Sequence, residues 1–390
     1  MATADADRQA QLNWLALHLV PGLGTRNALK LIRAFGSPER VFHASFTELR
    51  SCGLREVVGS AIHSGMSFED ADAEQNKVKQ AGAEIVSIHD AKYPERLKEI
   101  YGPPILLYVR GRTEALIGES LGVVGSRRPT PYGMAVARKL SREFTQVGMT
   151  VVSGMARGID TYAHQGAIEA GGPTVAVLGC GVDVVYPREN RKLADEIVDK
   201  GVIVSEFPMG STAFPQNFPI RNRVISGLSL GVMVVEGAQY SGSLITARLA
   251  LDQGREVFAV PGSIVSKPSW GPNLLIKQGA KLVQDASDVV EDLPLDAKQR
   301  LAHRQEIADA EKQVETSSGG QASLWENGTT PLAKKLLPLL KIDQSIHIND
   351  IIRSCNRNSP SEILSALSEL ELYGLARQLP GKHFVRVWIS

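Results

Sequence analysis

Short apolar runs alternate with helical patterns through the middle of this 390-residue chain. The runs at 121–124, 150–152 and 174–178 are mostly apolar, which is typical of strands buried on both faces of a parallel sheet. Between the first two runs, residues 134–147 place apolar side chains at helical spacing and stop at Gly148. This alternation predicts an α/β fold, an extended Rossmann-like domain with a doubly wound sheet.

The same alternation continues on both sides of these runs. Further strands are expected at 202–205, 231–236 and 257–260. One helix is expected at 191–200, and another is expected to end at Asp252. Upstream, the pattern predicts a helix at 68–81, a strand at 84–88, a short helix at 93–100 and a strand at 105–109. These upstream elements are expected to extend the edge of the central sheet.

The N-terminal part, residues 12–64, has a helical pattern throughout. A Gly-rich turn with Gly22 and Gly24 lies between two helices and resembles the turn of a helix–hairpin–helix motif, with a weaker copy at 49–62. We therefore expect a small helical domain of the sterile-alpha-motif or helix–hairpin–helix type. Backbone N–H groups of such a turn can bind phosphate, and a packing or partner-binding module remains equally open. Three cations follow the first turn: Arg26, Lys30 and Arg33.

The composition changes after Leu293. A charged, helix-prone segment at 298–314 precedes a Ser/Gly/Gln-rich linker at 315–327. Three helices at 332–340, 347–355 and 360–373 and a hairpin at 374–389, turning at Pro380-Gly381-Lys382, then predict a winged-helix-like domain. Its third helix has no Lys or Arg, so a protein-contact or regulatory role is favoured over groove reading. The predicted domains are 1–75 (helical), 76–295 (extended Rossmann fold), 296–330 (linker) and 331–390 (winged-helix-like).

Composition and charge restrict the function classes. With 43% hydrophobic and 22% charged residues, the chain has the composition of a globular protein, and no apolar run is long enough to cross a bilayer. The three cysteines lie far apart, which favours a reducing cytoplasm and argues against a zinc site. The net charge is only +1, so any nucleic-acid binding must depend on a local patch.

Candidate anion-binding residues follow the first two strands of the core. Gly125-Ser126-Arg127 comes directly after one strand, and Ser153-Gly154 after the next. The carboxyl ends of parallel strands meet at one sheet edge, where helix N-termini attract anions. Arg127 is the main candidate for a phosphate contact. The small residues that are expected to form a wall and offer N–H donors to the same anion are Ser153, Gly154 and Gly158.

A second basic stretch contains Arg221, Asn222 and Arg223. If the segment is extended, both arginines point to one side and clamp adjacent phosphates, with Asn222 bonding a base edge or sugar. If the segment is helical, the arginines diverge and one of them is structural. Phe214 and Phe218 could stack on bases, although phenylalanines beside prolines are more often packing residues.

Two further candidates lie on the same predicted edge. Ser241-Gly242-Ser243 precedes a helix and offers either a second anion contact or an ordinary N-cap. Arg188 could extend a track for a nucleic-acid backbone.

Asp160 and His164 lie four residues apart, on one face of a predicted helix. An acid–base pair is conceivable, but a structural hydrogen-bond pair is favoured. The chain shows no activated nucleophile, metal-ligand cluster or P-loop, so no catalytic residue, metal or cofactor is expected. The rival interpretation is a nucleotide hydrolase whose anion pocket holds a ribose phosphate and in which Asp160 or Glu236 acts.

Six ordered motifs resemble the signature of the DprA family of DNA-processing proteins, also called Smf. They are Gly125-Ser126-Arg127, the run from Ser153 to His164, Tyr186-Pro187, Phe218-Pro219-Ile220-Arg221-Asn222-Arg223, the run from Ser241 to Ala247, and Val260-Pro261-Gly262. The match covers about residues 80–290, and the helical N-terminus and winged-helix-like C-terminus are similar to those of longer members.

The resemblance implies a function that composition and spacing alone do not show. It implies single-stranded DNA binding in the Rossmann domain, with Arg127 in the DNA pocket and a basic residue at Arg188. It also implies a homodimer that protects incoming single-stranded DNA and helps load RecA recombinase during natural transformation, without catalytic turnover. The apolar stretch 274–283 is our candidate for the dimer interface.

Overall fold

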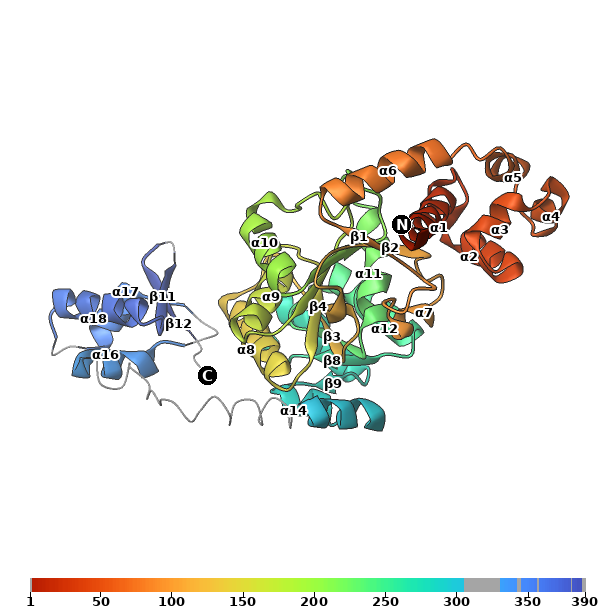
Figure 1. Ribbon diagram of the computed structural model, residues 1–390. Coiled ribbons are helices and arrows are strands. Elements are labelled where there is room, and N and C mark those ends of the chain that lie inside the picture. Colours follow the sequence, from red (N-terminus) through yellow and green to blue (C-terminus); the bar gives the residue numbers. More distant parts are fainter. Residues whose placement is uncertain (1, 305–329, 342–344, 356–357, 380, 388–390) are drawn as a thin grey trace.

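The computed structural model describes residues 2–304, 330–341, 345–355, 358–379 and 381–387. Six helices form the N-terminal part of the chain (Figure 1), as the hydrophobic pattern predicted. They are α1 (Ala2–Leu19), α2 (Gly24–Phe35), α3 (Pro38–His43), α4 (Phe46–Ser51), α5 (Glu56–His63) and α6 (Phe68–Gln80). The predicted domain boundary at 75/76 falls inside α6, because this helix runs to Gln80 and buries Val78 in the same core cluster as α1.

The central sheet has nine strands in the order β1-β2-β6-β5-β4-β3-β7-β8-β9. Neighbouring strands are parallel throughout the stretch β6-β5-β4-β3-β7-β8-β9. The strand β2 is antiparallel to both of its neighbours, β1 and β6. The chain starts the parallel part at β3, builds outward through β4, β5 and β6, and then returns to the other side of β3. The doubly wound sheet is therefore confirmed, and so is its extension by the two upstream strands. The strands are β1 (Glu84–Ser87), β2 (Leu106–Gly111), β3 (Ser120–Val124), β4 (Thr150–Ser153), β5 (Thr174–Val177), β6 (Val202–Ser205), β7 (Gly231–Val234), β8 (Glu256–Ala259) and β9 (Lys281–Leu282).

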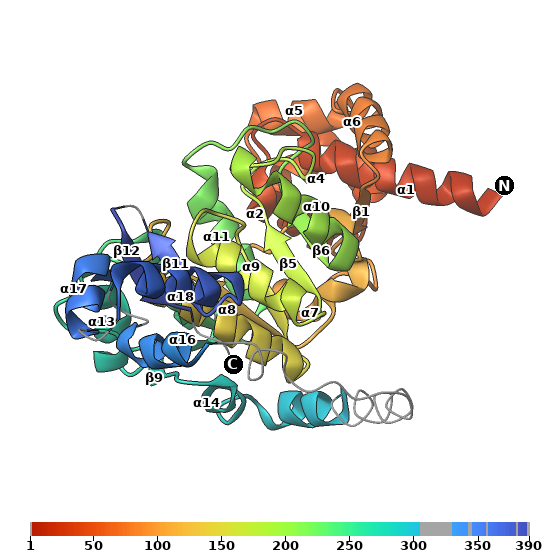
Figure 2. The ribbon, with the colours of Figure 1, turned by 90° about the vertical axis from the view of Figure 1, so that its left-hand side faces the viewer.

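Helices cover both faces of the sheet. Figures 1 and 2 show α8 (Pro131–Gln146), α9 (Ile159–Glu169) and α10 (Arg191–Lys200) on one face and α11 (Asn217–Leu228) and α12 (Gly242–Asp252) on the other. The short helices are α7 (Glu95–Lys98), α13 (Trp270–Lys277) and α14 (Ala286–Val290). The helix α8 begins earlier than the predicted 134, because Thr130 caps it and Pro131 occupies its first turn. The predicted helix at 93–100 shortens to α7.

Successive side chains of β3 point to opposite faces of the sheet, and helices cover both of these faces. Leu121 and Val123 pack with α8 and α9, whereas Val124 packs with the cluster beneath α11 and α12. Because every residue of β3 is buried, both faces of this strand must be apolar or small. On the far face, Gly122 would place a Cβ only 3.1 Å from Val232, which leaves little room for a larger residue.

The N-terminal helices share a core with the sheet instead of standing apart from it. Leu15 and Leu17 of α1 belong to the same apolar cluster as Tyr108 of β2 and Ile203 of β6. The Glu74 carboxylate of α6 accepts a hydrogen bond from the Met209 backbone N–H at 2.6 Å. The helical part and the sheet are therefore fixed relative to each other.

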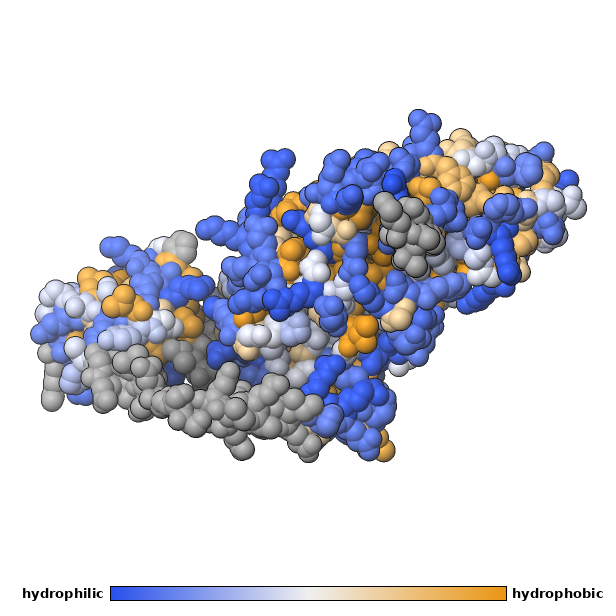
Figure 3. Space-filling model, viewed as in Figure 1, coloured by the Kyte–Doolittle hydropathy of each residue, from blue (hydrophilic) through white to orange (hydrophobic). Residues whose placement is uncertain are grey.

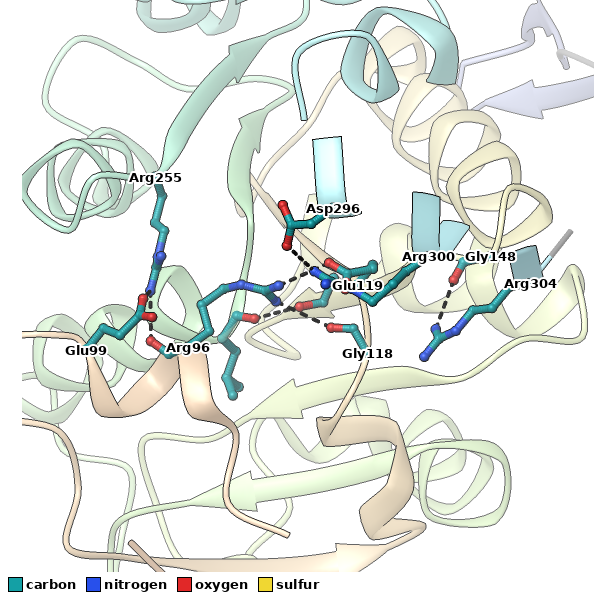
Figure 4. Close-up of polar contacts among 11 residues, drawn as sticks. Arg96, Glu99, Gly118, Glu119, Gly148, Arg255, Asp296, Arg300 and Arg304 are labelled. Atoms are coloured by element: carbon teal, nitrogen blue, oxygen red, sulfur yellow. Dashed lines mark hydrogen bonds and ion pairs between the residues drawn. The ribbon is translucent and has the colours of Figure 1, made fainter. Parts of the chain in front are cut away.

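A buried carboxylate attaches the segment that follows α14 to the amino edge of the sheet (Figure 4). The Glu119 carboxylate pairs with Arg96 of α7 at 3.0 Å and with Arg300 at 2.5 Å. Arg300 lies in the helical residues 295–304, so the first residues of the predicted 296–330 linker are helical and pack on the core. The remainder of the predicted 296–330 linker, and of the helix-prone segment 298–314, lies outside the described residues.

The C-terminal part has the three helices and the hairpin that the sequence predicted, with one additional short strand. The helices are α16 (Pro331–Leu336), α17 (Ile348–Ser354) and α18 (Pro360–Leu372), and the three-stranded sheet has the order β10-β12-β11, with β10 (Ile346–His347), β11 (Ala376–Leu379) and β12 (His383–Arg386). Of the predicted turn, Gly381 and Lys382 are described and Pro380 lies outside the described residues. Hydrophilic side chains cover most of the molecular face seen in Figure 3.

Candidate functional site

The topological switch point of the sheet lies between β3 and β7, where ligands of doubly wound folds commonly bind. Here the protein's own carboxylate fills it. Glu236, which follows β7, is buried and accepts hydrogen bonds from the Thr130 backbone N–H at 2.9 Å and the Thr130 hydroxyl at 2.5 Å. A Cβ on Gly133 would lie 2.5 Å from this carboxylate, so only glycine fits there. The N-terminus of α8 therefore holds the protein's own carboxyl group, whose pKa is raised by burial.

The open pocket lies to one side of the switch point, above the ends of β3, β4 and β5. The residues that line it come from four turns and from α11. They are Arg127, Gly154, Ala156, Arg157, Leu178, Gly179, Cys180, Tyr186, Pro187, Phe218 and Arg221. This pocket is our candidate functional site.

Arg127 lies at the mouth of the candidate site. Its guanidinium carbon is 5.1 Å from the centroid of the Phe218 ring, and its side chain is exposed. Among the described residues, Arg127 forms no salt bridge and no hydrogen bond. The Phe218 ring also packs against Tyr186, with ring centroids 5.8 Å apart. Arg127 interacts electrostatically with the buried Asp160 carboxylate but forms no salt bridge with it. A guanidinium that is held over an aromatic ring without a salt bridge is available to a ligand anion.

Arg221 forms the buried floor of the candidate site. Only 4% of its surface is exposed, and its guanidinium donates to the Gly154 carbonyl at 2.8 Å and to the Val177 carbonyl. A Cβ on Gly154 would lie 2.3 Å from this guanidinium, so the glycine makes room for it. Burial lowers the pKa of Arg221, and the negative charge of Asp160 opposes that shift.

The segment that carries Arg221 and Arg223 is helical, so the two side chains diverge. Arg223 lies on the other side of α11, where it donates to the Gly102 carbonyl at 2.8 Å and pairs with Glu206. The alternative in which both arginines clamp adjacent phosphates side by side is therefore wrong. Asn222 accepts a hydrogen bond from the Arg221 Nε at 3.2 Å. It supports Arg221, and a contact between Asn222 and a base remains a prediction.

The small residues of the two turns mainly allow those turns to pack together. A Cβ on Gly125 would lie 2.6 Å from Ile159, and one on Gly158, whose φ is +79°, would lie 2.3 Å from the Ser126 carbonyl oxygen. Ser153 is fully buried and its hydroxyl donates to the Val123 carbonyl at 2.6 Å. The prediction that Ser153 contacts the anion is therefore wrong, because it is closed to any ligand.

Asp160 and His164 are both structural, but they do not pair with each other as predicted. The Asp160 carboxylate accepts from the backbone N–H groups of Gly154 at 3.2 Å and Ala156 at 3.3 Å. The N–H of Gly154 is therefore engaged within the protein. The Thr174 hydroxyl donates to a backbone carbonyl and hence accepts from His164 Nδ1 at 2.7 Å. Burial raises the pKa of Asp160 and, aided by the positive charge of Arg221, lowers the pKa of His164 to about 3.

The remaining predicted site residues lie on the same sheet edge but do not line the candidate site. Ser241 and Ser243 bond to each other through their hydroxyls at 2.7 Å, at the start of α12 beyond β7. Arg188 is exposed in the 3₁₀ turn Arg188–Asn190. Ser126 accepts from the Arg128 backbone N–H at 3.1 Å. A contact of Ser126, Arg188 or the Ser241-Gly242-Ser243 turn with a ligand remains a prediction.

Two aromatic side chains, Phe218 and Tyr186, make contacts in the site that the sequence did not predict. The Phe218 ring contacts two arginines, Arg127 at 5.1 Å and Arg221 at 5.9 Å from guanidinium carbon to ring centroid, whereas its neighbouring prolines suggested a simple packing role. Tyr186 stands in the sequence only as part of a Tyr-Pro motif, yet it lines the pocket and contacts Phe218. Only tertiary structure shows these contacts, because 32 positions of the chain separate the two rings.

Within the residues that the structure describes, no three His, Cys, Asp or Glu side chains come together as a metal site would require. No helix in the same residues combines the length and the apolar character needed to span a bilayer. The three cysteines are free thiols.

Comparisons with known proteins agree with this architecture. Residues 84–294 match the family model described as DNA recombination-mediator protein A, and residues 321–382 match the DprA winged helix domain. The chain is 46% identical over 217 residues to the DNA processing protein DprA of Bacillus subtilis, which covers 55% of this chain and 73% of that protein.

Two solved structures are similar to this fold. The X-ray structure of DprA from Streptococcus pneumoniae has a TM-score of 0.66 at 35% identity, covering 73% of this chain and 98% of that one. The structure of DNA processing protein A from Helicobacter pylori has a TM-score of 0.50 at 29% identity, covering 55% of this chain and 99% of that one. That protein is described as having a unique single-stranded DNA binding mode. The family model alone spans more than half of the chain, so this protein belongs to the DprA (Smf) family of DNA recombination-mediator proteins.

Proposed function

We propose that this protein binds single-stranded DNA at the candidate site, without catalytic turnover. The observation that carries the proposal is Arg127, an exposed guanidinium that forms no salt bridge among the described residues and lies 5.1 Å from the centroid of the Phe218 ring. A phosphate meets the guanidinium, and an adjacent base reaches the aromatic surface of Phe218 and Tyr186. The single-stranded DNA binding mode described for the Helicobacter pylori protein supports this assignment.

The pocket contacts that we propose carry little sequence information. A guanidinium binds any phosphate, and every base has a face that stacks on an aromatic ring. Binding should therefore be independent of sequence and should weaken as salt rises.

The nucleotide-hydrolase alternative has no observation in its favour. Both candidate acids already have structural partners: Asp160 bonds two backbone N–H groups, and Glu236 bonds Thr130. Neither carboxylate is among the residues that line the candidate site.

The test is fluorescence anisotropy of a labelled oligo-dT across a salt series, with a duplex of the same length as control. We expect a clear preference for the single strand. The logarithm of the binding constant should fall linearly with the logarithm of salt concentration, by about 0.7 per phosphate contact. Equal binding of both DNA forms, or affinity that does not change with salt, would contradict the proposal.

We further propose that a homodimer holds the strand in the cytoplasm, protects it and helps load RecA recombinase onto it, as in natural transformation. The candidate interface, residues 274–283, includes the edge strand β9, whose two residues are exposed. Sedimentation analysis tests the dimer. Stimulated RecA filament formation on strands coated with single-strand binding protein tests the loading, and a lack of stimulation would contradict it.

A further inference from the structure

A second groove lies on the opposite side of α11 from the candidate site. Its walls are the start of α2, the Tyr101-Gly102 turn and the side of α11 that carries Ile220 and Arg223. Because the N-terminal helices share a core with the sheet, both walls of the groove have fixed positions. We call it the α2–α11 groove.

The first turns of α11 form a wall of both this groove and the candidate site. Phe218 and Arg221 line the candidate site, while Ile220 and Arg223 line the groove. Residues three apart lie on one side of a helix, so each pair forms one wall. A strand bound at the candidate site therefore reaches the groove by crossing the exposed N-terminal part of α11.

The groove contains an aromatic side chain that packing does not explain. Tyr101 is 75% exposed, and the Arg26 guanidinium carbon lies 5.0 Å from its ring centroid. The turn that carries this ring is held in place. The Gly102 carbonyl accepts from Arg223 at 2.8 Å, and Gly102 has the left-handed φ of +67° that favours glycine. Tyr101 and Arg26 thus repeat the pairing of Phe218 and Arg127.

The charges in the groove favour an anion. Arg26 has no acidic partner among the described residues, and the first turn of α2 contains no acidic side chain. The acid in the groove wall, Glu206, is engaged by Arg223. Leu23 and Gly24 at the start of α2 line the groove, and Leu23 provides no side-chain cap, so the positive end of this helix lies at the groove.

We propose that the α2–α11 groove binds the next nucleotides of the same single strand, with a base stacked on Tyr101 and a phosphate at Arg26. This inference rests on the proposed function and extends it, since it makes the N-terminal helices part of the DNA track. Continuity with the candidate site across α11 and the positive charge of the groove argue for this occupant over a protein partner.

The test measures affinity against oligo-dT length. For the variant Tyr101→Ala we expect about a tenfold loss for oligomers of about 12 nucleotides, because one stacking contact is removed. We expect no change for oligomers of about four nucleotides, which fill only the candidate site. Tyr101→Trp should restore the affinity for the long oligomers, and this rescue also shows that the loss in Tyr101→Ala is not a folding defect.

A second variant tests the phosphate contact. Arg26→Gln should reduce the salt slope for long oligomers by about 0.7. Lys79→Gln, which removes an exposed cation at the end of α6 and away from the groove, should leave the slope unchanged.

The outcomes separate this inference from the proposed function. If Tyr101→Ala lowers the affinity of short and long oligomers equally, or of neither, while both still depend on Arg127, the groove inference is wrong and the proposed function stands. If the unmodified protein shows no preference for single strands, both are overturned.

Discussion

Replacing Arg221 by methionine should destabilise the protein, because this arginine supports buried polar groups. The substitution leaves the carbonyls of Gly154 and Val177 without their buried donor and removes the larger of the two positive charges, Arg221 and Arg127, that act on the Asp160 carboxylate. Each unsatisfied buried group costs about 1–3 kcal/mol, and the buried guanidinium also has a desolvation cost that the substitution removes. We therefore expect a net loss of about 2–4 kcal/mol in the free energy of unfolding.

Urea unfolding at pH 7, followed by circular dichroism, measures this loss. The same measurement at pH 5 gives the sign of the electrostatic contribution to this loss in the free energy of unfolding. Burial raises the pKa of Asp160 and the charge of Arg221 opposes that rise, so the variant should have an even higher pKa at Asp160. Protonation then removes the uncompensated charge, and the difference between variant and parent should shrink at pH 5.

A double variant tests the coupling. Arg221→Met combined with Asp160→Asn should be less destabilised than the sum of the two single variants, by about 1 kcal/mol. A single variant within about 0.5 kcal/mol of the parent, or strictly additive effects, would refute the structural role given to Arg221.

Two further predictions concern the buried groups around the site. Glu236→Gln should lower the free energy of unfolding by about 1–3 kcal/mol, because it weakens the bonds with Thr130, yet leave oligo-dT affinity unchanged. A nucleotide-hydrolysing activity that Glu236→Gln abolishes would instead support the rival enzyme. The pKa of His164 is lowered to about 3, so the folded state holds the ring neutral, and stability should fall as pH drops below the unfolded value of 6.5. At pH 5 this amounts to about 2 kcal/mol, and a His164→Leu variant with the same pH dependence as the parent would contradict it.

The sheet could be predicted from the sequence because its strands are buried on both faces. In β3, every side chain must be apolar or small whichever way it points, and this leaves an unbroken apolar run. The location of Arg127 at the ligand-binding edge of the sheet could also be predicted, because the carboxyl ends of neighbouring parallel strands always lie at one edge.

The roles within the site were harder to predict because they depend on contacts between distant segments. The spacing of Asp160 and His164 suggested a pair, but backbone N–H groups and Thr174 are their partners. Helical spacing places two side chains on one face and does not show what lies opposite each of them.

Two further features could be seen only in the structure: the residue that fills the switch point, and the position of the N-terminal helices beside the sheet. No local pattern shows that Glu236, 106 residues after Thr130, closes the crevice. Nor does the pattern around Tyr101 reveal that α2 lies beside it, since that contact depends on how the helical part packs on the sheet.

The most direct test of the central claim compares two adjacent arginines. Arg127 lines the candidate site, whereas its exposed neighbour Arg128 does not. Oligo-dT affinity is measured for Arg127→Ala and Arg128→Ala, with thermal melts to show that both variants are folded. We expect Arg127→Ala to weaken binding about 10- to 100-fold, the value of a charge-assisted phosphate contact, and Arg128→Ala to have little effect. An unchanged affinity for folded Arg127→Ala, or equal losses in both variants, would contradict the claim.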